Sequence, residues 1–169
     1  MPAFYPVGSF VSYRQNGICK IVNITTQKFD RVPKTYYILQ SVYGDTTQIF
    51  VPADTPDLDT HMRPILRRDQ IDCIISESEK GSLPWHNDSR QRHEMYSSIM
   101  AGGDRVQILQ MIKQLSLHRT EVEKAGRKFY AIDENMLNRA SKVITEDFAF
   151  ALGLPKEQVI SYILNQIQK

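Results

Sequence analysis

The sequence contains little cysteine: Cys19 and Cys73 are the two cysteines among 169 residues. They lie far apart and lack Cys-x-x-Cys spacing, which argues against a disulfide framework or a structural zinc site and fits a reducing compartment. No apolar run approaches the roughly 20 residues that a membrane-spanning helix needs. The N-terminal segment also lacks the basic and apolar regions of a secretory leader. We therefore expect a cytoplasmic protein that is not bound to a membrane.

Net charge is nearly absent as well, because 21 Lys and Arg residues stand against 19 Asp and Glu residues, a formal charge of +2. This balance excludes a polycation or an acidic tail. The excess is local: residues 85–130 carry eight basic and five acidic residues, a net charge of +3. Such a segment attracts phosphate, but it is equally compatible with a solvated helical face.

Motifs for catalysis are missing. The sequence has no phosphate-binding loop and no Gly-x-Ser-x-Gly, and its four histidines lack the i, i+4 spacing of metal ligands. We therefore expect no enzyme, no catalytic residue, no metal, no cofactor and no small-molecule substrate. The sequence favours a binding protein.

The first third of the chain predicts β structure. Short segments rich in β-branched and aromatic residues at 10–13, 18–26, 35–43 and 46–52 are separated by turn signals at Asn16-Gly17 and Gly44-Asp45. In the second segment, alternation places Ile18, Val22 and Ile24 on one face and Cys19 and Ile21 on the other. Four short strands at this spacing predict a small, strongly bent antiparallel barrel, followed by a loop over residues 53–64.

After residue 65 the apolar period changes from 2 to about 3.6 residues. Helices are expected at about 68–79, from Asp88 to about 100, from Asp104 onward, from Asp133 to about Leu152, and after Pro155. Their apolar stripes suit a compact bundle. The predicted class is α+β with two domains, a β-barrel at 1–62 and an all-α helical domain at 65–169.

Trp85 is the best single candidate for a binding residue. It is the one tryptophan, and it is followed by polar and basic residues that include Arg90, Arg92 and His93. An aromatic ring beside cations suits nucleic acid, because the ring stacks on or wedges beside a base while the cations bind phosphates. The alternative is a tryptophan that pins its loop to the helical bundle.

The order and spacing of several short motifs resemble the CarD family of bacterial transcription regulators over essentially the whole chain. These motifs are Val7-Gly8, Val11-Ser12-Tyr13, Asn16-Gly17, Ile21 to Ile24, Tyr36-Tyr37-Ile38-Leu39, Ile49-Phe50-Val51-Pro52, Trp85 and Gly103-Asp104.

The resemblance implies an N-terminal Tudor-like barrel that binds the β subunit of RNA polymerase, similar to a domain of the transcription-repair coupling factor. It also implies a helical domain that contacts promoter DNA at the upstream edge of the melted region, where a tryptophan in the minor groove helps to hold the open complex. DNA binding by the free protein is expected to be weak. The alternative is an adaptor that binds polymerase without touching DNA.

By this resemblance Trp85 is the wedge residue. The expected DNA-binding set is Trp85, Arg90, Arg92, His93, Lys113, Arg119, Lys124, Arg127 and Lys128. The expected polymerase-binding set is Thr25, Gln27, Gln48, Ile49, Phe50 and Val51. Some relatives have arginines where this chain has Gln27 and Phe50, so a more apolar polymerase contact is expected here.

Overall fold

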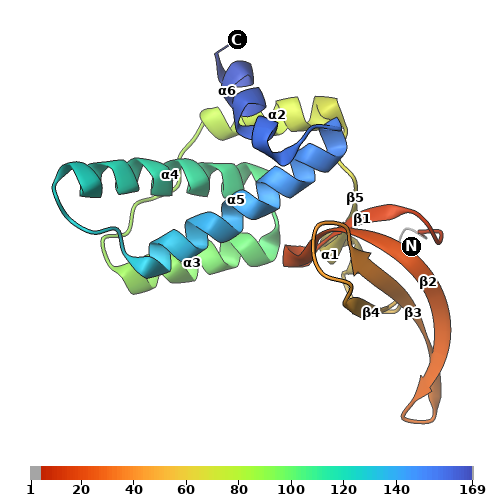
Figure 1. Cartoon of the computed structure of the whole chain (residues 1–169). Coiled ribbons are helices and arrows are strands. Elements are labelled where there is room, and N and C mark those ends of the chain that lie inside the picture. The colour runs from red at the N-terminus through yellow and green to blue at the C-terminus, as the bar shows by residue number, and fades with distance from the viewer. Residues whose placement is uncertain (1–4, 169) are drawn as a thin grey trace. The chain divides into compact units, whose positions relative to one another are not determined.

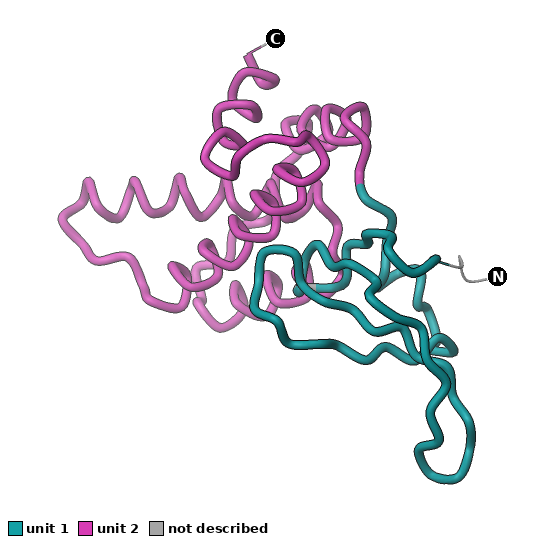
Figure 2. The backbone as a smooth tube through the Cα atoms, turned by 45° about the vertical axis from the view of Figure 1, so that its right-hand side comes forward, with its two compact units in different colours: residues 1–65 teal, residues 66–169 magenta. Residues whose placement is uncertain are grey.

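The computed structural model describes residues 5–168. The chain divides after Ile65 into two compact units, which Figure 2 shows in different colours. The first unit holds the β-strands and the second holds the long helices (Figure 1). An antiparallel sheet followed by helices confirms the predicted α+β class. We describe each unit by itself.

The first unit is a five-stranded sheet in the order β4-β3-β2-β1-β5. All neighbouring strands are antiparallel. The strands are β1 (Phe10–Tyr13), β2 (Gly17–Phe29), β3 (Val32–Ser41), β4 (Gln48–Pro52) and β5 (Met62–Pro64). Because β4 and β5 form the two edges and do not pair with each other in the described sheet, the sheet is open and the Tudor-like barrel is not confirmed.

A β-bulge in β2 changes which side chains face the core. Ile21 pairs with Leu39, but the next paired residue is Asn23, opposite Ile38, so the register shifts at Val22. One extra residue reverses the alternation beyond the bulge. Cys19 and Ile21 are buried in the core of this unit, and Ile24 then packs against the same core. The prediction that Ile24 shares a face with Ile18 is therefore wrong.

Strands β2 and β3 are longer than predicted and form one hairpin that extends beyond the rest of the sheet (Figure 1). The hairpin turns at Asp30 and Arg31, whose φ angles of 55° and 67° are both left-handed, as in the two-residue turns that match strand twist. This turn contains no glycine or asparagine, which are the usual sequence signals for left-handed turn positions.

The loop predicted over residues 53–64 is also partly wrong. It contains α1 (Leu58–His61) and β5, which pairs with β1. The buried side chains of Leu58 and Met62 explain this order, since both pack into the core of the first unit.

The second unit confirms the predicted helices. They are α2 (Arg68–Glu79), α3 (Ser89–Gly102), α4 (Arg105–Lys124), α5 (Ala131–Leu152) and α6 (Val159–Ile167). The Asp88 and Asp104 side chains accept backbone N–H groups at the starts of α3 and α4. Gly103 and Gly153 end α3 and α5 with φ angles of 72° and 67°.

Every one of these helices contributes to one hydrophobic core, with Ile71, Tyr96, Leu115, Phe148 and Val159 as examples from α2 to α6. This shared core fixes the positions from which the side chains described below extend. Among residues 5–168, no helix is both long enough and apolar enough to cross a bilayer.

Candidate functional site

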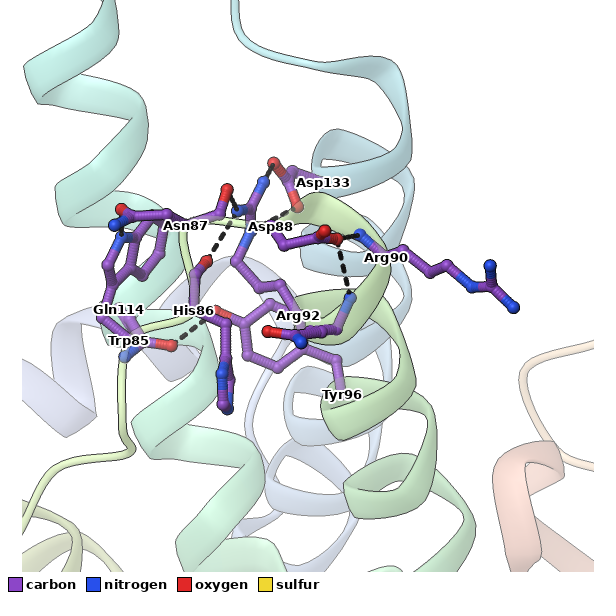
Figure 3. Close-up of polar contacts among 10 residues, drawn as sticks. Trp85, His86, Asn87, Asp88, Arg90, Arg92, Tyr96, Gln114 and Asp133 are labelled. Atoms are coloured by element: carbon purple, nitrogen blue, oxygen red, sulfur yellow. Dashed lines mark hydrogen bonds and ion pairs between the residues drawn. The ribbon is translucent and has the colours of Figure 1, made fainter.

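Trp85 lies in the irregular segment between α2 and α3, and its side chain is partly open to solvent, with 40% of its surface exposed. The indole Nε1 donates a hydrogen bond to the Asn87 side-chain oxygen at 2.9 Å (Figure 3). This bond satisfies the one polar atom of the ring. The apolar ring is therefore held at the surface in a defined orientation.

Arg92 reaches Trp85 from inside the unit. Its Nε and Nη2 donate to the two carboxylate oxygens of Asp133 at 3.2 and 2.6 Å. Its Nη1 donates to the backbone carbonyls of His86 and Asn87 at 2.9 and 3.3 Å (Figure 3). The guanidinium carbon lies 4.8 Å from the centre of the Trp85 ring. One guanidinium thus joins α3, α5, the backbone after Trp85 and the ring itself.

This placement corrects the expectation that Arg92 binds phosphate. Only 2% of its surface is exposed, and its charge is compensated by the buried Asp133 carboxylate. Asp133 lies in the first turn of α5, where a carboxylate is also favoured by the helix dipole. Arg92 is therefore a positioning residue for Trp85, and its side chain is not available at the surface.

The other side of the Trp85 segment is anchored to α4 by Gln114. The Gln114 amide donates to the backbone carbonyl of Leu83 at 2.9 Å, and its oxygen accepts a hydrogen bond from the Tyr96 hydroxyl. Burial raises the pKa of Tyr96 to about 12, so that the hydroxyl remains a donor throughout the physiological range. The segment is consequently fixed both before and after Trp85.

A groove of about 520 Å³ opens beside Trp85. It is lined by Trp85, Asn87, Arg92, Gln114, Leu117, His118, Glu121, Arg127 and Tyr130. The ring centres of His118 and Trp85 are 4.4 Å apart. Burial of the ring and, after it, the nearby Arg92 charge lower the pKa of His118 from its ordinary value, which favours the neutral imidazole. The groove therefore combines aromatic rings with a few polar groups.

The remaining predicted DNA-binding residues are dispersed over the helical unit. Arg90 is exposed on α3 and lies 3.4 Å from Glu94, and the His93 ring is 3.5 Å from the Ser97 hydroxyl. Lys113 forms an ion pair with Glu79 at 2.8 Å.

Four further predicted cations lie on or after the second half of α4. Arg119 pairs with Glu123 at 3.1 Å, whereas Lys124, Arg127 and Lys128 are exposed at and beyond the end of the helix. Of the predicted cations with exposed side chains, Arg127 is the one that lines the groove with Trp85.

The groove contains residues that sequence reasoning missed, namely Asn87, Gln114, Leu117, His118, Glu121 and Tyr130. Leu117 and Tyr130 are large apolar residues with exposed side chains, which can mark a binding surface. Their exposure becomes visible only in the structure. His118 and Glu121 are one helical turn apart on α4, but no local pattern indicates that this face meets Trp85.

In the first unit, four of the six predicted polymerase-binding residues lie on β4 and divide between its two faces. Ile49 and Val51 pack into or against the core, whereas Gln48 and Phe50 are exposed, with 46% of the Phe50 surface open. This division follows from strand alternation. Thr25 and Gln27 are half-buried on β2, which β3 separates from β4. The six residues therefore do not form one continuous exposed surface.

The first unit matches a known protein family. Residues 5–66 match the family described as the CarD-like/TRCF RID domain. The matched range covers the described part of the first unit and ends at the first residue of the helical unit. A search of curated proteins found no match to the chain.

Proposed function

We propose, on the premise that residues 5–66 belong to the CarD-like/TRCF family of RNA polymerase-interacting domains, that this protein is a non-enzymatic regulator of transcription initiation. Its first unit is an RNA polymerase-interacting domain. In the proposal this unit binds the polymerase β subunit, and the helical unit contacts promoter DNA at the upstream edge of the melted region. The bound protein then stabilises the open complex.

The edge strand β4 supports the polymerase contact. The described sheet is open, so β4 offers an edge to which an extended segment of a partner can add as a further strand. Phe50 points out of this strand with 46% of its surface exposed, while Ile49 and Val51 hold the strand on the core. Backbone pairing along β4 and an aromatic anchor at Phe50 together suit a specific protein contact.

The observation that carries the DNA contact is a half-exposed tryptophan prearranged by a buried arginine. Arg92 and Asn87 hold the Trp85 ring before any ligand binds. Ordering a side chain in advance removes part of the entropy cost of binding. The exposed ring then stacks on or wedges beside a base step, as aromatic and apolar side chains do in minor-groove and single-strand binders.

Tethering explains how a weakly basic unit acts on DNA. A net charge of +3 over residues 85–130 supplies modest phosphate attraction. Once the first unit is docked on polymerase, the helical unit is held near the promoter at a high local concentration. DNA binding that is weak for the free protein becomes effective in the complex.

The test is the lifetime of the open complex formed by purified bacterial RNA polymerase, measured with and without the protein. We expect the wild-type protein to lengthen this lifetime and Trp85→Ala to lose most of the effect, because one aromatic–base contact is worth about 1–3 kcal/mol, or roughly 5- to 150-fold. A protein that binds polymerase but leaves the lifetime unchanged is an adaptor, and the DNA contact is then refuted.

Polymerase binding is tested separately with Phe50→Ala. We expect about tenfold weaker binding, as for an interface anchor. Phe29→Ala is the matched control, since Phe29 is an exposed phenylalanine of the same unit on β2, outside β4. Equal binding by both variants would remove Phe50 from the interface.

A further inference from the structure

Three aromatic residues from separate segments line the groove beside Trp85. Trp85 comes from the segment before α3, His118 from α4, and Tyr130 from the residue immediately before α5. Tyr130 is 64% exposed although its neighbour Phe129 is buried in the core. Leu117, also exposed, lines the same groove. The groove therefore combines exposed aromatic and apolar side chains from three segments with polar groups, which makes it a candidate ligand site.

We propose that this groove is a binding site for one unpaired nucleobase of a DNA strand. The inference rests on the proposed function and deepens it, because it names the part of the DNA that the helical unit takes up. In the proposal the base packs against the exposed aromatic surface of Trp85 and Tyr130, and the sugar-phosphate backbone of the bound nucleotide runs past Arg127. The groove volume of about 520 Å³ lies within the range of about 300–1,000 Å³ that is common for sites of small organic ligands.

The charged residues that line the groove include Glu121 and Arg127, which are both exposed, and the buried Arg92. The positive charge of Arg92 is compensated by Asp133, and burial lowers the pKa of His118, which favours its neutral form. Glu121 contributes a carboxylate to the lining. In the proposal the neutral base lies toward Glu121 and the phosphate toward Arg127, because a phosphate beside Glu121 would meet negative charge. The carboxylate also accepts hydrogen bonds from exocyclic amino groups, such as N4 of cytosine.

In the proposal, exposed cations at the end of α4 and just after it bind the phosphates of the strand. Arg127 lines the groove with an exposed side chain and follows the last turn of α4. Lys124 and Lys128 are exposed nearby in the sequence. This segment therefore offers cations to the backbone of a strand whose base lies in the groove.

The groove requires an unpaired base. In a duplex, the faces of a base are stacked on its neighbours and its pairing edge is occupied, so it is not available to a protein groove without being turned out of the helix. A strand that is already single supplies the base without this cost. We therefore expect preferential binding to single-stranded DNA, and a requirement for bases rather than for phosphates alone.

The experiment uses the full chain and follows Trp85 fluorescence directly, because Trp85 is the single tryptophan. The probe is a short oligodeoxycytidylate, titrated at low salt. The comparison strand has the same length and the same phosphates but abasic sugars. We expect the Trp85 fluorescence to change and to reach saturation as the cytidylate is added. The abasic strand should bind at least tenfold more weakly.

Two variant pairs locate the site. Tyr130→Ala should weaken cytidylate binding by about 5- to 150-fold, while Tyr130→Phe, which keeps the ring, should bind as the wild type does. Arg127→Gln should weaken the binding of both strands and make that binding less dependent on salt concentration. The control is Lys142→Gln, because Lys142 is an exposed lysine of α5 that does not line this groove. This control should change neither the affinity nor its salt dependence.

Equal affinity for the cytidylate and the abasic strand would overturn the proposal, as would unchanged binding by Tyr130→Ala. No saturable response to the cytidylate would overturn it as well. None of these titrations contains polymerase or duplex DNA, so these results would leave polymerase docking and contact with paired DNA standing. Failure to bind polymerase or to lengthen the open-complex lifetime would instead refute the proposed function and leave base binding by the groove intact.

Discussion

Replacing Arg92 by methionine tests the claim that a buried ion pair orients Trp85. The substitution keeps a long side chain but removes four hydrogen bonds, two to Asp133 and two to the carbonyls of His86 and Asn87. It leaves the Asp133 carboxylate buried without its cation. Breaking a buried pair on one side costs about 3–5 kcal/mol, so we expect Arg92→Met to lower the free energy of unfolding by that amount.

Urea unfolding of the full chain measures this cost, and Arg90→Met is the matched control. Arg90 is also an arginine of α3 with an acidic partner, Glu94, but both side chains are largely exposed. An exposed pair of this spacing is worth about 0.5 kcal/mol or less. We also expect the Trp85 emission of folded Arg92→Met to shift toward longer wavelengths, because the segment loses its anchors and the ring becomes more hydrated.

The double variant Arg92→Met with Asp133→Leu keeps the test valid if the single variant does not fold. Removing both charges leaves no buried unpaired charge in this pair, so the double variant should be more stable than Arg92→Met alone. A cost for Arg92→Met that equals the cost for Arg90→Met, together with unchanged Trp85 emission, would refute the reasoning that Arg92 holds the tryptophan.

Two further predictions concern pH and glycine. Because the folded state lowers the pKa of His118 below 6.5, the protein should lose stability as the pH falls below about 6.5, and His118→Gln should lose less over the same range in urea unfolding. A titration midpoint for His118 at or above 6.5 by NMR would contradict this. Gly102 and Gly153 both have open space where a Cβ would lie, but Gly153 has φ +67°. In urea unfolding, Gly102→Ala should therefore stabilise the protein by about 0.5–1 kcal/mol, and Gly153→Ala should destabilise it by about 1–2 kcal/mol. Effects of the same sign would be inconsistent with this account.

Local rules predicted the helical unit well. The starts of α3 and α4 are set by the side chains of Asp88 and Asp104, and the end of α3 by Gly103, each acting within a few residues of the chain. Signals of this range are visible in a sequence. The β2–β3 turn at Asp30 and Arg31 was not predicted, because it contains no glycine that would signal it locally. Its two strands pair up to Phe29 and Val32, on either side of the turn.

The site itself depended on contacts that no local pattern encodes. Arg92 looked like a surface cation at a helix start, but its partner Asp133 lies 41 residues away on another helix. In the structure, 40% of the Trp85 surface is exposed. The ring contacts from His118 and Arg92, however, exist only once α3 and α4 are packed.

The Arg92–Asp133 pair also limits how this protein can change over generations. Each residue stands on a different helix, and either one alone would be a buried charge without compensation. If one of the two positions changes first, the intermediate protein has a less stable fold and a Trp85 ring that is held less firmly. Positions 92 and 133 are therefore expected to be replaced jointly or kept jointly.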